Sequence, residues 1–255
     1  MFLQKPADIF LPPNTQCLIK SLNLELADDD CMYAGNDRHY LSCGASALNT
    51  IFAALSLSQQ YTPGSILDFG AGAGRVTRWL RAAFPDIAID CCDLRTEDMT
   101  FCEKAFAVKT WISGVEIADL SARSTYDLIW IGSVMTHLPA NSTTQLLDKV
   151  LSWCNHGGLV VTSLHGRSAL RRHEDGRLKY IEDSKWKEIK NGYLSTGYGF
   201  SNYAEKQDYG ISTTKLSWVT SLIESRSDIK LVLLSEEAWD GHHDVLAIQK
   251  MGRKP

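Results

Sequence analysis

The sequence has little excess charge and lacks a long uninterrupted apolar run. Its 26 basic and 30 acidic residues give a formal net charge of −4 at pH 7. Proteins that mainly grip a phosphate backbone are usually basic. No stretch reaches the roughly 20 consecutive apolar residues expected of a membrane span. These absences disfavour both nucleic acid and a membrane as partners.

Paired-cysteine and metal-binding motifs are also missing. The seven cysteines form no C-x-x-C pair, and the seven histidines show no spacing such as H-E-x-x-H. No metal is therefore predicted, and His242-His243 is expected to lie exposed in a terminal turn. The N-terminus has no charged start followed by an apolar core, so it does not resemble a signal peptide. An odd cysteine count without such a signal predicts reduced thiols and a cytoplasmic protein.

The chain is long enough for one large domain with added segments. It has 255 residues, of which 44% are hydrophobic. The proline-containing residues 1–20 are expected to form an irregular arm, and the apolar spacing over 37–60 predicts a helix. Residues 1–60 would then form an arm and a helical cap, and residues 61–255 the main domain.

From residue 65 onward, apolar strands alternate with amphipathic helices, which is typical of a parallel α/β sheet. A long segment separates the fifth strand from the next one. We therefore expect residues 166–213 to be an insertion at the carboxyl ends of the strands, where open α/β sheets bind ligands. The predicted strands are 65–70, 87–92, 108–113, 126–132, 159–164, 230–235 and 245–250, and the predicted helices are 75–84, 97–106, 142–155 and 214–225.

A glycine-rich turn stands between the first strand of this region and its helix. The stretch Ile66–Thr77 contains three alternate glycines. Glycines let backbone N–H groups come close to a ligand, and a helix N-terminus adds partial positive charge. The dinucleotide pattern G-x-G-x-x-G does not fit, because Arg75 or Thr77 stands where the third glycine should be. The turn could also be a simple link between strand and helix.

The pattern that does fit is D-x-G-x-G-x-G, beginning at Asp68. It resembles the first motif of the class I S-adenosylmethionine-dependent methyltransferases. The resemblance implies that the turn, with Gly70, Ala71 and Gly72, packs on the amino-acid end of S-adenosyl-L-methionine. Asp68 would lie close to the ammonium group of the cofactor.

Asp93 ends the second predicted strand, about 20 residues after the glycines. An acid at such a position can accept hydrogen bonds from both hydroxyls of a ribose. The alternative is an exposed carboxylate in a loop. In the resembled family an acid at this point holds the cofactor ribose, and the next residue, here Leu94, packs on the adenine.

Two later segments, Tyr126–Pro139 and Asn155–Gly166, resemble the same family. The first implies that Gly132 and Ser133 border the sulfonium and the incoming substrate. It lacks the Asn/Asp-Pro-Pro-aromatic run common in enzymes that methylate amino groups of DNA bases. The whole resemblance covers about residues 65–166. It implies a doubly wound, mostly parallel seven-stranded sheet with an antiparallel last strand, a helical N-terminal cap and an insertion after strand five.

His137 and His165 are the candidate catalytic residues. They follow the fourth and fifth predicted strands, and a base helps when the methyl acceptor is a hydroxyl. A neutral imidazole suits that role at pH 7. Either histidine could instead cap a helix or bond a loop carbonyl.

Aromatic residues are interleaved with glycines in the insertion. This composition suits a lid that stacks on a flat or sugar-like ligand, and it equally suits a small core under a long loop. Tyr198, Asn202 and Tyr203 are the predicted substrate contacts.

The sequence therefore predicts an S-adenosylmethionine-dependent methyltransferase acting on a small molecule, such as a hydroxyl of a saccharide or another metabolite. The alternatives are a protein or RNA methyltransferase, and a non-catalytic partner protein with the same fold. The intact Asp68, glycine turn and Asp93 disfavour the non-catalytic alternative. The acceptor and the oligomeric state cannot be read from these residues.

Overall fold

The computed structural model describes residues 1–5, 9, 11–12, 15–60 and 62–252. Part of the predicted arm and the first residue of the predicted main domain thus lie outside the described residues. Within the arm, Leu18–Ser21 forms a short helix, α1. Phe2 forms an isolated bridge with Glu25, so the described part of the arm is tied to the segment that follows it.

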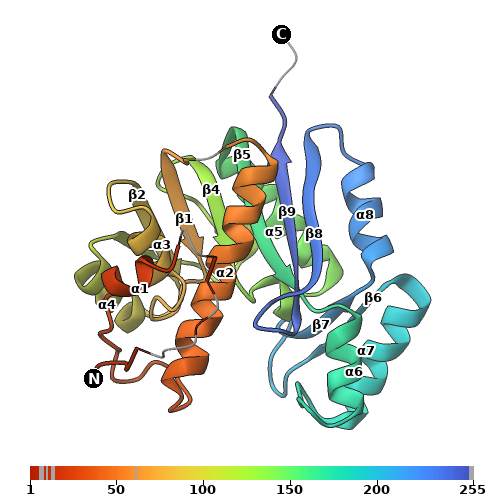
Figure 1. Cartoon of the computed structure of the whole chain (residues 1–255). Helices are drawn as coiled ribbons and strands as arrows, with labels where there is room; N and C mark the ends of the chain where they lie inside the picture. Colours follow the sequence, from red (N-terminus) through yellow and green to blue (C-terminus); the bar gives the residue numbers. More distant parts are fainter. Residues whose placement is uncertain (6–8, 10, 13–14, 61, 253–255) are drawn as a thin grey trace.

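A seven-stranded sheet forms the centre of the molecule, in the order β3-β2-β1-β4-β5-β9-β8 (Figure 1). Strand β9 runs antiparallel to both of its neighbours, whereas β1, β2, β3, β4 and β5 pair in parallel. This confirms the predicted doubly wound, mostly parallel sheet with an antiparallel last strand. The strands are β1 (Ser65–Phe69), β2 (Ala88–Asp93), β3 (Lys109–Ile112), β4 (Tyr126–Ile131), β5 (Cys154–Leu164), β8 (Ile229–Trp239) and β9 (His243–Lys250).

Helices cover both faces of this sheet (Figure 1). Successive strand residues point to opposite faces, and so Leu128 and Ile129 of β4 belong to two different buried apolar clusters. The first cluster includes side chains of α2, α3 and α4, and the second includes side chains of α5 and α8. These helices are α2 (Asp37–Leu57), α3 (Thr77–Ala83), α4 (Thr96–Phe106), α5 (Ala140–Trp153) and α8 (Leu216–Glu224).

Helix α2 is the predicted helical cap. It begins after Asn36, whose side chain accepts a hydrogen bond from the His39 amide and so caps the helix. By length and composition this 21-residue helix could cross a membrane, which was not predicted from the sequence. However, 61% of its most apolar stretch is buried within the fold. A core helix passes the same test, so this feature is weak support for a membrane span.

The insertion after β5 is a folded unit with its own small core. It contains α6 (Arg167–Glu174), α7 (Asp183–Thr196) and a two-stranded sheet of β6 (Tyr198–Asn202) and β7 (Gly210–Thr214). Figure 1 shows it below the sheet, beyond the ends of β5 and β9. It therefore lies at the predicted edge. Its buried apolar residues are Leu170, Trp186, Ile189 and Ile211.

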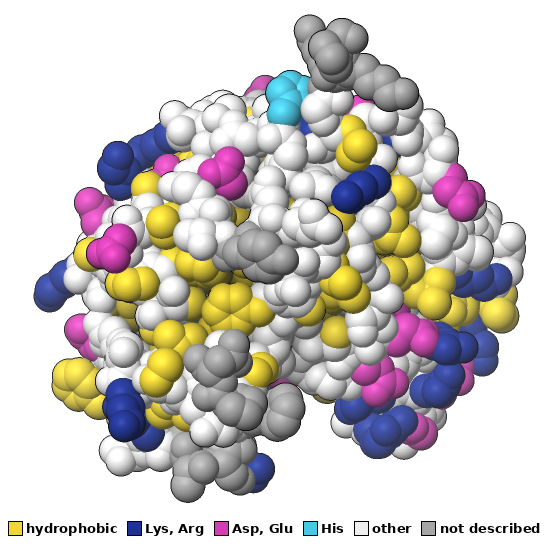
Figure 2. All heavy atoms as spheres, turned by 45° about the horizontal axis from the view of Figure 1, so that its top comes forward, with side chains coloured by type: hydrophobic (Ala, Val, Ile, Leu, Met, Phe, Trp, Pro, Cys, Tyr) yellow, Lys and Arg dark blue, Asp and Glu magenta, His cyan; other side chains and the backbone are white. Residues whose placement is uncertain are grey.

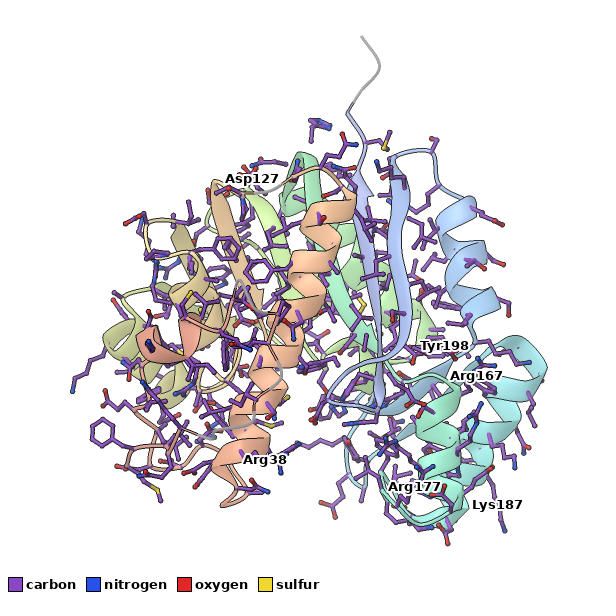
Figure 3. All side chains as sticks on the ribbon, in the orientation of Figure 1. Arg38, Asp127, Arg167, Arg177, Lys187 and Tyr198 are labelled. Atoms are coloured by element: carbon purple, nitrogen blue, oxygen red, sulfur yellow. The ribbon has the colours of Figure 1, made fainter. Side chains whose placement is uncertain are left out.

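Two labelled residues in Figure 3 mark the two ends of the strands, which we call the top and bottom edges of the sheet. Asp127, near the start of β4, lies at the top, and Arg38, near the start of α2, lies at the bottom. The parallel strands end at the bottom edge, and β9 begins there because it is antiparallel. Figure 2 shows basic and acidic side chains intermixed on the side of the inserted helices, where Arg177 and Asp175 form an ion pair.

Strand β5 begins earlier than predicted. Residues 155–158 were expected to end the preceding helix and precede the strand, but β5 starts at Cys154, directly after α5. The carbonyl of Gly157 accepts hydrogen bonds from the side chains of Gln60 and Gln249, and Asn155 donates to Asp127. This polar segment interrupts the regular pairing of β4 with β5 between Cys154 and Leu159, and Gly157 has a positive φ of 82°. Contacts with distant residues hold it in place.

Candidate functional site

The glycine-rich turn lies at the carboxyl end of β1. Gly70, Gly72 and Gly74 have positive φ angles of 76°, 52° and 78°, which residues with side chains rarely adopt. A Cβ atom on Gly70 would lie 2.4 Å from Val134 Cγ2, and one on Gly74 would lie 2.3 Å from Phe106. No described heavy atom outside the turn lies within 4 Å of the same position on Gly72. The backbone at Gly72 is therefore open to a ligand.

Asp93 lies beside this open backbone, at the end of β2. One of its carboxylate oxygens accepts the Gly72 amide at 2.8 Å, and the other accepts the Leu94 amide at 2.6 Å. Each carboxylate oxygen can accept a further hydrogen bond. The side chain thus joins the turn to β2 and can still receive donors such as ribose hydroxyls. We call the open region in front of Gly72 and Asp93 the crevice.

Three apolar side chains are exposed next to Asp93. Leu94, Ile112 and Val115 are 54%, 47% and 80% exposed, and they lie at the ends of the neighbouring strands β2 and β3. The Ser113 amide donates to the Asp93 carbonyl at 2.8 Å, which holds the loop after β3 beside Asp93. Such side chains offer a surface for a flat ring. Leu94 was predicted, whereas Ile112 and Val115 were not.

Asp68 lies beneath the turn rather than in front of it. It is 1% exposed, and it accepts a hydrogen bond from the Thr77 hydroxyl at 2.7 Å. Burial raises the pKa of Asp68 to about 7, although the Thr77 hydrogen bond opposes the rise. A carboxyl group this deeply buried has no access to an ammonium group in the crevice. Asp68 instead ties β1 to the start of α3, and the predicted direct contact is not supported.

Gly132 and Ser133 follow β4 at the same edge. A Cβ atom on Gly132 would lie 2.8 Å from Trp130 Nε1 and 3.0 Å from the Trp239 ring. Ser133 has a φ of 61°, and its amide donates to the Ser163 hydroxyl at 2.8 Å. A positive φ in a residue with a side chain persists only where surrounding contacts hold it, and it is enriched at functional sites. The predicted border between cofactor and acceptor thus has a constrained backbone.

His137 lies in the 3-10 turn Met135–His137 that follows β4. Its Nδ1 atom lies 2.8 Å from the Gly210 carbonyl oxygen and 3.2 Å from the Tyr203 hydroxyl. A carbonyl oxygen only accepts, so Nδ1 carries the proton and the lone pair of the neutral ring is on Nε2. Burial lowers the pKa of His137. The ring is therefore neutral at pH 7 and able to take up a proton.

Two tyrosines of the insertion pack on His137. The ring centroids of Tyr203 and Tyr209 lie 5.9 Å and 5.3 Å from that of His137. Burial and, to a smaller extent, the Asp93 carboxylate raise the pKa of Tyr209, so Tyr209 lies within electrostatic range of Asp93. The insertion therefore covers His137 with Tyr203 and Tyr209. Tyr203 was predicted as a substrate contact, whereas Tyr209 was not.

Tyr198 does not reach the crevice. It is 7% exposed, and its hydroxyl lies 2.7 Å from that of Thr143 and donates to the Leu138 carbonyl at 2.8 Å. Its ring packs edge-on against Trp218, and Figure 3 shows it between α8 and the inserted helices. Tyr198 therefore anchors β6 on the domain, contrary to the prediction. Asn202 remains a candidate, because its side-chain oxygen is buried without a hydrogen-bond partner among the described residues.

His165 directly follows β5 and is 3% exposed. Its Nδ1 atom lies 3.3 Å from the Ser212 carbonyl oxygen, so this nitrogen also carries the proton. Burial, with smaller contributions from His242 and His137, lowers the pKa of His165 to about 3. Both candidate histidines are thus neutral at pH 7, but His165 is enclosed while His137 is partly exposed.

Known proteins resemble this chain in sequence and in fold. Residues 67–160 match the family described as a methyltransferase domain. The malonyl-[acyl-carrier protein] O-methyltransferase of Halalkalibacterium halodurans is 24% identical over 154 residues, or 52% of this chain. The match spans 56% of that protein, so this chain aligns with little more than half of the relative's length.

Solved structures share the fold over most of the chain. An S-adenosylmethionine-dependent methyltransferase from Clostridium acetobutylicum has a TM-score of 0.56 at 11% identity, covering 81% of this chain and 92% of that one. The N-methyltransferase NodS of Bradyrhizobium japonicum, in complex with S-adenosyl-L-homocysteine, has a TM-score of 0.53 at 14% identity, covering 92% and 98%. These similarities confirm the predicted class I methyltransferase fold.

Proposed function

We propose that this chain is a class I methyltransferase that binds S-adenosyl-L-methionine in the crevice and transfers its methyl group to a hydroxyl of a small molecule. The observation that carries the proposal is the open backbone at Gly72, held 2.8 Å from the Asp93 carboxylate. A nucleoside with a charged tail needs a backbone that its tail can approach closely and an acid beside it that accepts hydrogen bonds from the ribose.

The residues present fit the cofactor. Asp93 would accept hydrogen bonds from the ribose hydroxyls, because each of its oxygens has acceptor capacity left. Leu94 and Ile112, both exposed beside Asp93, would pack on the adenine. The turn at Gly70–Gly72 would contact the amino-acid end. The complex of NodS with S-adenosyl-L-homocysteine supports this choice of cofactor.

The chain supplies positioning and a base. The bound cofactor supplies an electrophilic methyl group on a sulfonium. Holding the acceptor oxygen about 3 Å from that carbon accounts for much of the rate in such displacements. His137 would take the acceptor proton on Nε2, while its Nδ1 proton is held by the Gly210 carbonyl at 2.8 Å. Tyr203 and Tyr209 pack on the His137 ring and would exclude water around it.

Several observations favour a small acceptor. The net charge of −4 and the mixed charges over the inserted helices do not suit a nucleic-acid backbone. The insertion, which has its own core, limits access to His137. A saccharide or another hydroxylated metabolite is the class we propose. The relative named as a malonyl-[acyl-carrier protein] O-methyltransferase supports oxygen as the acceptor atom.

Calorimetric titration with S-adenosyl-L-methionine and its demethylated product tests the cofactor. We expect the wild-type chain to bind both, and Asp93→Asn to weaken binding about 10- to 100-fold, since charge-assisted hydrogen bonds contribute about 1.5–3 kcal/mol. Asp86→Asn, an exposed acid at the opposite edge, is the matched control and should bind as wild type. No heat and no thermal stabilisation by either ligand would reject the proposal.

The acceptor is tested by incubating the protein with labelled cofactor and a panel of hydroxylated metabolites, amines and carboxylic acids. Methylation of a hydroxyl that falls about 10²- to 10⁴-fold in His137→Gln, with the cofactor Kd unchanged, is expected for a general base. Transfer only to amines or carboxylates would contradict the hydroxyl assignment and retain the cofactor assignment.

A further inference from the structure

Three histidines lie side by side at the carboxyl edge of the sheet. His165 follows β5, His242 lies in the turn before β9, and His243 begins β9. The ring centroids of His165 and His243 are 4.7 Å apart, and those of His242 and His243 are 4.2 Å apart. One ring nitrogen from each histidine lies within 4.8 Å of the other two. We call these three residues the histidine cluster.

In the histidine cluster, His165 and His243 are buried and His242 is partly buried, contrary to the prediction that His242-His243 is exposed. His165 and His243 are 3% and 6% exposed, and the His242 side chain is 15% exposed. The prediction failed because β9 is antiparallel, so its first residue stands beside the end of β5. Nδ1 of His243 is buried and has no hydrogen-bond partner within the described part of the chain. A buried polar atom of this kind calls for an explanation such as a bound ion.

The other two histidines already have the outer contacts of metal ligands. Nδ1 of His165 lies 3.3 Å from the Ser212 carbonyl oxygen, and Nδ1 of His242 lies 2.9 Å from the Asp240 carbonyl oxygen. Each carbonyl holds the proton on Nδ1 and leaves the lone pair on Nε2. In metal sites, a ligating histidine almost always donates its second N–H to such a partner.

We propose that His165, His242 and His243 bind a divalent transition-metal ion, with zinc as the best match. Three imidazoles and one open position form a known arrangement of catalytic zinc, and imidazole suits zinc better than it suits magnesium or calcium. At zinc–nitrogen distances of about 2.0–2.1 Å, tetrahedral ligands lie roughly 3.4 Å apart. The ligand nitrogens now lie within 4.8 Å of one another. To bind zinc, the side chains would rotate so that these nitrogens move closer by about an ångström.

The surroundings combine favourable and opposing charges. A carboxylate oxygen of Asp240 lies 3.9 Å from His242 Nδ1, and its negative charge favours a cation. The positive charge of Arg75 opposes cation binding. The Arg75 guanidinium lies over the ring of Trp239, and that ring packs against His243 with 4.7 Å between centroids. Tyr180 of the insertion covers His165 at 4.7 Å. The Tyr180 hydroxyl is also buried without a partner among the residues described.

Zinc binding to the full chain tests this proposal. After treatment with a chelator, the protein is titrated with Zn²⁺ by calorimetry and with Co²⁺ by visible absorption, which reports the coordination geometry. We expect one ion per chain and a tetrahedral or five-coordinate cobalt spectrum. His242→Ala removes the most exposed ligand and should weaken binding by about 100-fold or more, since even outer-shell changes cost 10- to 100-fold. His156→Ala, an exposed histidine at the opposite edge, is the matched control.

Two outcomes would overturn the inference. One is the absence of stoichiometric Zn²⁺ and Co²⁺ binding by wild type. The other is binding that His242→Ala leaves unchanged, because the ion would then lie elsewhere. Urea unfolding without metal checks that His242→Ala is folded, and a second variant, His242→Gln, serves if it is not. The readout is independent of the proposed methylation: a chain that binds zinc but not S-adenosyl-L-methionine would reject only the proposed function.

Discussion

The buried carboxyl group of Asp68 makes a prediction about stability and pH. Asp68 is 1% exposed, and burial raises its pKa to about 7 from an ordinary value of 3.8. The folded protein therefore keeps a proton on Asp68 at pH values where the unfolded chain has lost it. Wherever the folded state binds more protons than the unfolded state, stability falls as pH rises.

The size of the effect follows from this shift. A shift of one pKa unit corresponds to about 1.4 kcal/mol. The contribution of Asp68 is fully present below pH 3.8 and is lost as pH rises through about 7. Between pH 5 and pH 8 the loss is about 3 kcal/mol. Asp68→Asn cannot ionise, so its free energy of unfolding should rise relative to that of wild type by about that amount over the same interval.

Urea unfolding at closely spaced pH values measures this difference. Other groups titrate in the same range, but they are shared by both proteins and cancel in the comparison. Thr77→Val provides a second check: the Thr77 hydrogen bond lowers the pKa of Asp68, so its removal should shift the loss of stability to higher pH. Parallel stability profiles for wild type and Asp68→Asn would refute the assignment of a buried, protonated Asp68.

The remaining predictions concern backbone strain and the proposed base. Gly70→Ala should cost about 2–4 kcal/mol in urea unfolding, because it combines a positive φ with a Cβ 2.4 Å from Val134. The control is Gly176→Ala, where φ is also 76° but no described atom beyond the chain neighbours lies within 4 Å of the added Cβ, so it should cost only about 1–2 kcal/mol. Equal losses of stability in the two variants would show that the contact with Val134 adds nothing. If His137 is the base, kcat should fall only below pH 6.5, because burial lowers its pKa from that value. A fall in kcat that begins above pH 6.5 in wild type and is absent in His137→Gln would disprove the lowered pKa of the base.

Local patterns in the sequence predicted most of the fold. Each inner strand is a short apolar run bounded by turn residues, so strands such as Tyr126–Ile131 are visible without tertiary information. The start of β5 was missed because residues 155–158 are polar and glycine-rich. They form an irregularity in the β4–β5 pairing. The Gly157 carbonyl there is held by Gln60 and Gln249, which lie 97 and 92 residues away in the chain. A local pattern does not contain such contacts.

The candidate site divides in the same way. The glycine turn and Asp93 are local features with fixed spacing, and the structure brings them together through the Gly72 amide. Tyr198 and Tyr203 could not be told apart, since both are tyrosines in one aromatic-rich segment. The packing of β6 directs Tyr198 toward Thr143 and places Tyr203 beside His137.

Residues brought in by the antiparallel strand were harder to predict. His243 is buried only because β9 inserts between β5 and β8. The same pairing explains Gly166, where a Cβ atom would lie 1.8 Å from a carboxylate oxygen of Asp244. The sequence shows a His-Gly pair after β5 but contains no sign that a distant carboxylate occupies the space beside it.

Tyrosines of the insertion lie near both the Asp93 region and the two candidate histidines. It places Tyr209 within electrostatic range of Asp93, Tyr203 on His137 and Tyr180 on His165. These tyrosines come from one unit with its own apolar core, so their relative positions are set together rather than one by one. The proposed cofactor residues, in contrast, belong to the strand ends and the glycine turn. Under the proposed function, acceptor choice would therefore depend on the insertion, and cofactor binding would depend on the strand ends and the glycine turn.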